Sequence, residues 1–186
     1  MNNYSQFSYD GLWRKTKIVE TVAGSITSTR QFVWSANLTK PGEIRDGGGS
    51  TQIQMFGLGQ KNGSTKYFYS RDHLTSIREM TDFGGTTQAQ YSFDSFGRFL
   101  KQFEAVPSDF QYAGYYYHSR GAISFTATRV YNTGTGRFMS RDPIEEFGGL
   151  NLFSYVANCI FASFLAGSRR INLAGKPHSF WPPCRI

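Results

Sequence analysis

The sequence lacks the features of several common protein classes. It has only two cysteines, Cys159 and Cys184, which are too few for a disulfide framework and have no flanking metal ligands. Leucine and alanine are scarce, which argues against a protein built from long helices. Residues 1–11 contain neither a basic nor an apolar segment, so no signal peptide is predicted. Two cysteines do not indicate whether the protein is in an oxidising or a reducing compartment.

Long hydrophobic runs are also missing. The longest weakly polar stretch, residues 150–165, contains Asn151, Ser154, Asn158 and Ser163 and is shorter than the ~20 residues that a membrane-spanning helix needs. We therefore predict no membrane span and expect a short helical or irregular segment there.

The positive charge does not indicate nucleic-acid binding. The formal charge of +7 includes Arg169, Arg170, Lys176 and Arg185 in a tail without acidic residues, which leaves only about +3 on residues 1–166. The remaining arginines are scattered near turns, whereas a nucleic-acid surface gathers them on one face. We expect no specific nucleic-acid partner.

Aromatic residues and glycine are abundant, at 17% and 20 residues respectively. This composition favours short strands separated by tight turns, and the fold class predicted is mostly β. Strand-like runs lie at residues 6–9, 13–22, 25–36, 51–58, 65–70, 74–80, 86–93, 98–104, 122–131 and 137–140. Tyr67 and Tyr69 are spaced to point to one side of a strand, and Tyr91 and Phe93 repeat this spacing, so we expect one aromatic and one polar face.

A local pattern repeats along the chain, in which an aromatic residue is followed by aspartate and a turn before an Arg-led strand. The carboxylate can accept backbone N–H groups in the turn, while glycine supplies positive φ. The repetition is typical of a stacked repeat array. The residues that carry it are Tyr9, Asp10, Asp72, Phe93, Asp94, Gly97 and Arg98.

Two segments resemble a known family. Residues 67–100 (YFYSRDHLTSIREMTDFGGTTQAQYSFDSFGRFL) resemble the YD repeats of bacterial Rhs proteins. Residues 110–114 (FQYAG) and 128–152 (TRVYNTGTGRFMSRDPIEEFGGLNL) resemble the Rhs-associated core, whose pattern is approximately R-x-Y-x-x-x-x-G-R-F-x-S-x-D-P followed by G-G-x-N-L-Y-x-Y-V. Its matching residues here are Gly136, Arg137, Phe138, Pro143, Gly148, Gly149, Asn151, Leu152, Tyr155 and Asn158.

The resemblance implies a long β-ribbon coiled into part of a curved shell that encloses a C-terminal toxin. It divides the chain into repeats at 1–105, a core region at 106–165 and a divergent tail at 166–186. The implied partners are further shell or upstream repeats and a toxin cargo, and a full-length protein of this kind would be secreted or on the cell surface. Because so few strands leave edges and an aromatic inner face exposed, we expect a fragment or remnant of such a shell, or a partner of another shell piece.

The family also implies an aspartyl self-protease that uses two carboxylates. Asp142 of the R-D-P step fits the first, with Arg141 as a neighbour able to hold it ionised, although a turn carboxylate before proline is an equal alternative. Leu165 stands where the second aspartate is expected, so we predict no self-cleavage unless Glu145 or Glu146 replaces it.

Two further interpretations stay open or are set aside. Tyr112, Tyr115, Tyr116 and Tyr117, together with Trp13 and Trp34, either stack on a cell-surface glycan or line the inner sheet face. His73, His118 and His178 are isolated from one another, so no metal site is predicted, and no cofactor is expected.

Overall fold

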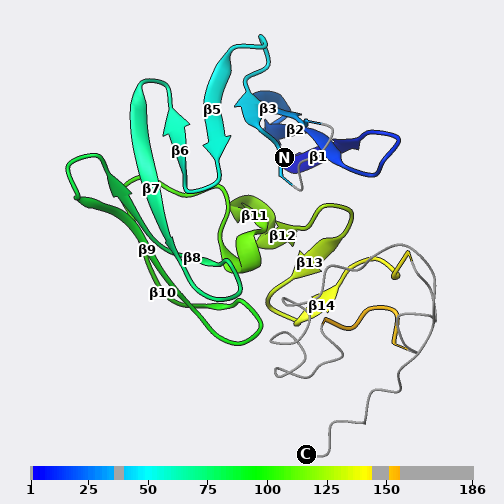
Figure 1. The fold of residues 1–186 in the computed structure, drawn as a ribbon. Helices are drawn as coiled ribbons and strands as arrows, with labels where there is room; N and C mark the ends of the chain where they lie inside the picture. Colours follow the sequence, from blue (N-terminus) through cyan, green and yellow to red (C-terminus); the bar gives the residue numbers. More distant parts are fainter. Residues whose placement is uncertain (1, 36–39, 144–150, 156–186) are drawn as a thin grey trace, which may run out of the picture.

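The computed structural model describes residues 2–35, 40–143 and 151–155. Within them the chain forms a ten-stranded antiparallel sheet in which every strand pairs with the next along the sequence (Figure 1). Its strands are β1 (Tyr4–Tyr9), β2 (Lys15–Val22), β3 (Ser25–Val33), β4 (Glu43–Arg45), β5 (Thr51–Phe56), β6 (Gly59–Asn62), β7 (Thr65–Arg71), β8 (Ile77–Asp82), β9 (Thr87–Phe93) and β10 (Phe99–Glu104). The mostly β fold predicted from the sequence is confirmed.

A second sheet of four strands follows, again antiparallel and in sequence order. It consists of β11 (Tyr116–His118), β12 (Ile123–Phe125), β13 (Val130–Asn132) and β14 (Arg137–Phe138). Two single 3-10 turns, η1 (Tyr112–Gly114) and η2 (Ser119–Gly121), precede and follow β11. In the described part of the chain, no helix is both long and apolar enough to span a membrane.

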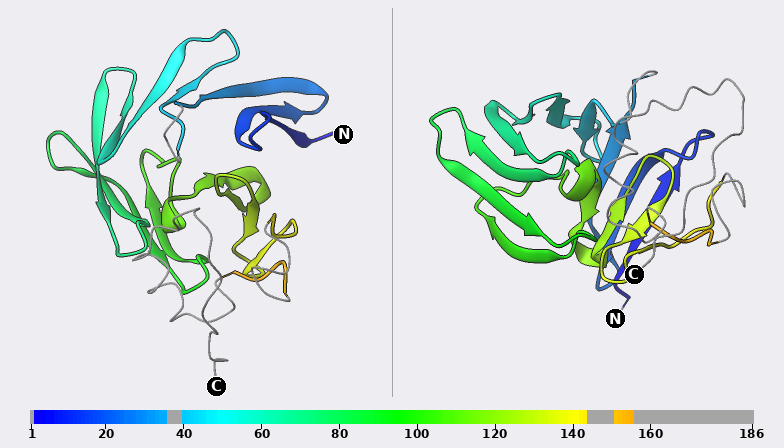
Figure 2. Two further views of the ribbon diagram at one scale, coloured as in Figure 1. Left: turned by 45° about the vertical axis from the view of Figure 1, so that its right-hand side comes forward. Right: turned by 60° about the horizontal axis from the view of Figure 1, so that its bottom comes forward.

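The large sheet is curved, and the second sheet lies on its concave side (Figure 2). Side chains from both sheets form one core: Ile18, Phe32, Ile44, Ile77 and Met80 of the large sheet pack with Phe110, Tyr116 and Phe125. Isoleucine and aromatic residues suit this position because β-branched and flat side chains pack well on a pleated surface.

The alternation of side chains in β7 follows the expected pattern in part. Tyr67 and Tyr69 are half-buried, and Tyr69 lies beside Met80 of β8 on the inner face. Phe68 points the other way and is exposed. The outer face is therefore not uniformly polar.

The inner face is less exposed than the sequence indicated. We expected an uncovered aromatic surface, but the described residues that follow β10 cover it over β2, β3 and β7–β9. The physical reason is that Phe110, Tyr116 and Phe125 bury their rings against the large sheet, which removes apolar surface from water.

Three strands were absent from the sequence prediction. β4, β6 and β11 have only three or four residues each. β6 has no apolar side chain and β4 has only Ile44, so these strands show no alternation long enough to recognise. The predicted run 122–131 is in fact two strands, β12 and β13, separated by a turn in which Thr126 and Arg129 are hydrogen-bonded to each other.

Candidate functional site

Aspartate-centred turns join several strands of the large sheet. In the β1–β2 turn the Asp10 carboxylate accepts the N–H groups of Leu12 and Arg14, both at 2.9 Å, and the Nε of Arg14 at 2.8 Å. The β9–β10 turn repeats these bonds, with Asp94 accepting from Phe96, Arg98 and the Nε of Arg98. Asp72 does the same for the N–H groups of Leu74 and Ser76.

Two equivalent turns were missed in the sequence. Asp46 accepts from the N–H groups of Gly48 and Ser50, and Asp82 accepts from that of Thr86. The position three residues after each of the five aspartates has a left-handed φ, at Trp13, Gly49, Thr75, Gly85 and Gly97. The missed turns have no aromatic residue before the aspartate, so the sequence pattern did not find them.

The five turns fall into two sets. Because successive strands are antiparallel, the turns after odd-numbered strands lie at one end of the sheet and those after even-numbered strands at the other. Asp10, Asp72 and Asp94 belong to the first set, and Asp46 and Asp82 to the second. The YD-type positions predicted from the sequence therefore share one rim.

A cluster of tyrosines from the core region lies at this rim. Tyr112, Tyr131 and Tyr155 are buried together, and Phe138 packs against them. Burial raises the pKa of all three phenols, to about 12 for Tyr112, so they remain hydrogen-bond donors. Segments far apart in the sequence thus meet at one point.

This tyrosine cluster is attached to the Asp94 turn. The hydroxyl of Tyr112 donates to the carbonyl of Ser95 at 2.7 Å, and that of Tyr131 donates to the carbonyl of Phe96 at 2.8 Å. Phe93, at the end of β9, contacts the Tyr112 ring edge to face. The repeat turn and the core motif are therefore one packed unit.

Asp142 lies beside this cluster, held by an arginine from another part of the motif. Arg129 donates from Nη1 to the Asp142 carboxylate at 2.6 Å and from Nη2 to the carbonyl of Leu152 at 3.1 Å. Its guanidinium lies 3.5 Å from the Phe138 ring centroid and is almost fully buried. Arg141, which the sequence suggested as the neighbour of Asp142, is exposed.

The remaining motif residues lie near these contacts or outside the described residues. Gly136 has a φ of +66° beside Phe96, Arg137 forms a bridge with Ser154, and Pro143 is exposed. Asn151 accepts the N–H groups of Phe153 and Ser154. The positions predicted from the sequence that fall outside the described residues are Glu145, Glu146, Gly148, Gly149, Asn158, Cys159, Leu165, His178 and Cys184.

Polar contacts tie the second sheet to the large sheet. Glu20 of β2 accepts from His118 at 2.7 Å, from Arg120 at 3.0 Å and from Ser5 at 2.7 Å. His118 is 6% exposed, and its Nδ1 accepts the N–H of Gly121, so the proton is on Nε2. Glu20 was not a candidate from the sequence and His118 was set aside as isolated, because their side chains meet across about a hundred residues.

The aromatic residues considered for glycan binding are divided by the fold. Tyr112 and Tyr116 are 4% and 5% exposed, so their ring faces are not available to a sugar, whereas Trp13 at a hairpin tip is 73% exposed. Among the described residues, no three His, Cys, Asp or Glu side chains gather in a way that could hold a metal ion.

Comparison with known proteins gives similarity in structure only. No family model matches the chain, and no curated protein sequence matches it. The crystal structures of TcdB2-TccC3-TEV and TcdB2-TccC3-Cdc42 match 88% of the chain with a TM-score of 0.66, at 15% and 16% identity. A Photorhabdus luminescens Tc holotoxin pore with a TccC3 mutation matches 85% with a TM-score of 0.65, at 16% identity.

The chain spans only 8–9% of the length of those chains. At this identity the similarity shows the fold: the chain is folded like a short section of these toxin-complex structures. The predicted resemblance to Rhs-repeat proteins is therefore supported at the level of the fold.

Proposed function

We propose that this chain is a section of a curved β-shell wall with its own inner lining, and that its role is structural rather than catalytic. The large sheet would form the wall, and the described residues beyond 105 would form the lining. In a longer assembly of this kind, the enclosed cargo would be a C-terminal toxin or effector.

The open edges of the large sheet are the observation that carries this proposal. Within the described residues, β1 and β10 each pair with one neighbouring strand only. Exposed edges present unpaired N–H and C=O groups to which another strand can add. Further strands of the same repeat type, added at either edge, would extend the curved sheet.

The fold similarity supports the same interpretation. The neighbours are chains of TcdB2-TccC3 and of a Tc holotoxin pore, and the matched region covers only 8–9% of each of them. By analogy, the partners proposed here are other shell strands and toxin components. The division into repeats at 1–105, a core region at 106–165 and a tail at 166–186 remains part of this proposal.

Edge pairing can be tested by measuring association in solution. We expect the molar mass from light scattering to rise with concentration, because chains pair at β1 and β10. Replacing Gln6 and Ser8, both exposed on β1, by lysine should shift association to higher concentration, since charges on an edge strand oppose pairing. The control replaces the exposed residues Ser70 and Gln90 on interior strands by lysine.

The control variant should associate like the unmodified chain. A mass that stays monomeric at all concentrations, or equal effects of the two lysine pairs, would count against the wall proposal.

Self-cleavage is the alternative function, and we propose that it does not occur. The contact between Arg129 and Asp142 links the β12–β13 turn to the segment after β14, which fits a structural role for the Asp142 carboxylate. The expected result for purified chain is one species at full mass, unchanged by Asp142→Asn. A stable product ending near residues 165–170 that Asp142→Asn abolishes would establish the protease instead.

A further inference from the structure

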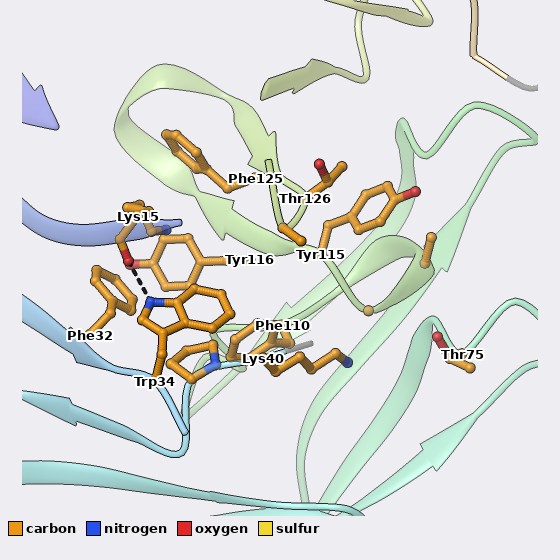
Figure 3. A pocket seen from close by; sticks show the side chains of 14 residues that line it. Lys15, Phe32, Trp34, Lys40, Thr75, Phe110, Tyr115, Tyr116, Phe125 and Thr126 are labelled. Carbon is orange, nitrogen blue, oxygen red and sulfur yellow. Dashed lines mark hydrogen bonds between the residues drawn. The ribbon is translucent and has the colours of Figure 1, made fainter. Parts of the chain in front are cut away.

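A cavity between the two sheets contains a lysine whose amine is unusually placed. The cavity has a volume of about 270 Å³ and is bounded by the start of β2, the end of β3, η1, β11 and β12 (Figure 3). Its aromatic walls are formed by Phe32, Trp34, Phe110, Tyr115, Tyr116 and Phe125.

Lys15 extends into a cage of rings at the wall of this cavity. Its Nζ lies 3.2 Å from the Tyr116 ring centroid and 4.2 Å from those of Phe32 and Phe125. The residue is 4% exposed, and among the described residues Nζ has no hydrogen-bond partner. Ring faces attract the ammonium but accept its N–H groups poorly.

The backbone of Lys15 is fixed by the same cavity wall. The indole N–H of Trp34 donates to the Lys15 carbonyl at 2.7 Å, as the dashed line in Figure 3 shows. This hydrogen bond fixes the backbone from which the Lys15 side chain extends, and the three rings hold its amine at the cavity wall.

A second amine lines the cavity. The Nζ of Lys40 lies 5.1 Å from the Phe110 ring centroid. A Cβ added to Gly114 would lie 2.5 Å from this Nζ. Gly114, with a φ of +65°, thus leaves the space that the Lys40 amine uses. The residues lining the cavity include two lysines and no Asp or Glu.

Burial disfavours the charge on both amines. Desolvation lowers the pKa of Lys15 to about 6, although the Asp109 carboxylate acts in the opposite direction. Desolvation and the nearby Arg71 lower the pKa of Lys40 to about 8. An anion in the cavity would relieve both effects and supply the acceptor that Lys15 lacks.

We propose that this cavity binds a carboxylate attached to an aromatic or apolar group, with Lys15 and Lys40 as the anion-binding residues and the aromatic walls around its apolar part. The site does not depend on the shell role, and a failure of either proposal leaves the other standing.

The test is a calorimetric titration of the chain at pH 6.0 with phenylacetate and with phenylacetamide, its neutral counterpart of the same shape. We expect phenylacetate to bind at least about tenfold more tightly, because the carboxylate accepts charge-assisted hydrogen bonds from the lysine amines and the neutral amide does not. N-acetylphenylalanine, whose amide mimics a preceding peptide bond, distinguishes a peptide C-terminus from a free acid: tighter binding than phenylacetate indicates the peptide.

Three variants locate the effect. Lys15→Met keeps the aliphatic stem and should weaken phenylacetate binding about tenfold without changing that of phenylacetamide. Lys40→Met should also weaken phenylacetate binding, and it replaces Lys15→Met in the test if that variant does not fold. Lys17→Met, an exposed lysine of the same strand, should change nothing.

The proposal is overturned if acid and amide bind equally, if neither binds, or if the Lys17→Met variant loses as much affinity as the cavity variants.

Discussion

Position 97 requires glycine for two independent reasons. Its φ of +85° lies in the left-handed region, which disfavours residues with a Cβ. A Cβ there would also lie 2.4 Å from the ring of Tyr112, which belongs to the buried tyrosine cluster. Gly85 has nearly the same φ, +84°, in the equivalent turn between β8 and β9, but nothing lies within 4 Å of its Cβ position.

The pair Gly97→Ala and Gly85→Ala therefore separates backbone strain from collision. We expect Gly85→Ala to lower the free energy of unfolding by about 1 kcal/mol from backbone strain alone. Gly97→Ala should lower it by about 2–4 kcal/mol, because the Tyr112 ring must also move. Urea unfolding followed by circular dichroism measures both, and equal losses would contradict the packing of the Asp94 turn on the tyrosine cluster.

Sequence reasoning at the scale of single residues succeeded where the contact is local. The Asp94 carboxylate and Gly97 act within one five-residue turn, so their pattern is visible in the sequence. The neighbour of Asp142 was assigned as Arg141 because it is adjacent in the chain, whereas the structure supplies Arg129. Nothing in the sequence could place Lys15 among three rings from β3, β11 and β12.

Among the elements, strands with alternating patterns and glycine turns were predictable, and short polar strands were not. β6 illustrates the limit: Gly59–Asn62 has no apolar side chain, and its position is fixed by pairing with β5 and β7 on either side. The contact between β2 and β11 was equally invisible, because it depends on Glu20 and His118 meeting through the fold.

The contact of Glu20 with His118 predicts that the interaction between β2 and β11 depends on pH. Burial alone would raise the pKa of Glu20, but hydrogen bonds from His118, Ser5 and Arg120 outweigh it and hold the pKa below its usual value. The carboxylate therefore stabilises the fold above the unfolded pKa of about 4.3, and this contribution is lost as the pH falls through the lower folded value.

Glu20→Gln should reduce the free energy of unfolding at pH 7 by about 1–3 kcal/mol, since charge-assisted hydrogen bonds are weakened. The difference from the unmodified chain should shrink as the pH is lowered below about 4. Thermal unfolding in a pH series measures this, and a difference that is constant from pH 7 to pH 3 would show that the charge of Glu20 is not involved.

The whole molecule differs from the sequence expectation mainly in its inner layer. We expected an open section of shell with an exposed aromatic face, but residues beyond β10 return across the concave side (Figure 2). Several of the contacts that hold this layer join residues 79 to 100 positions apart, such as those of Arg30 with Asp109 and Tyr116 and those of Glu20 with His118 and Arg120. Such pairs leave no periodic signal, so the resemblance to a family could suggest the shell but not the lining.

The most direct measurement of the central claim is hydrogen exchange of the backbone amides at a low and a high protein concentration. A lined wall section predicts slow exchange at both concentrations in β2–β9 and in β11–β13. At low concentration it predicts fast exchange of the alternate amides of β1 and β10 that point away from β2 and β9, and slower exchange of these amides when chains pair at high concentration. Exchange in β1 and β10 that does not depend on concentration, or fast exchange throughout β11–β13, would contradict the account.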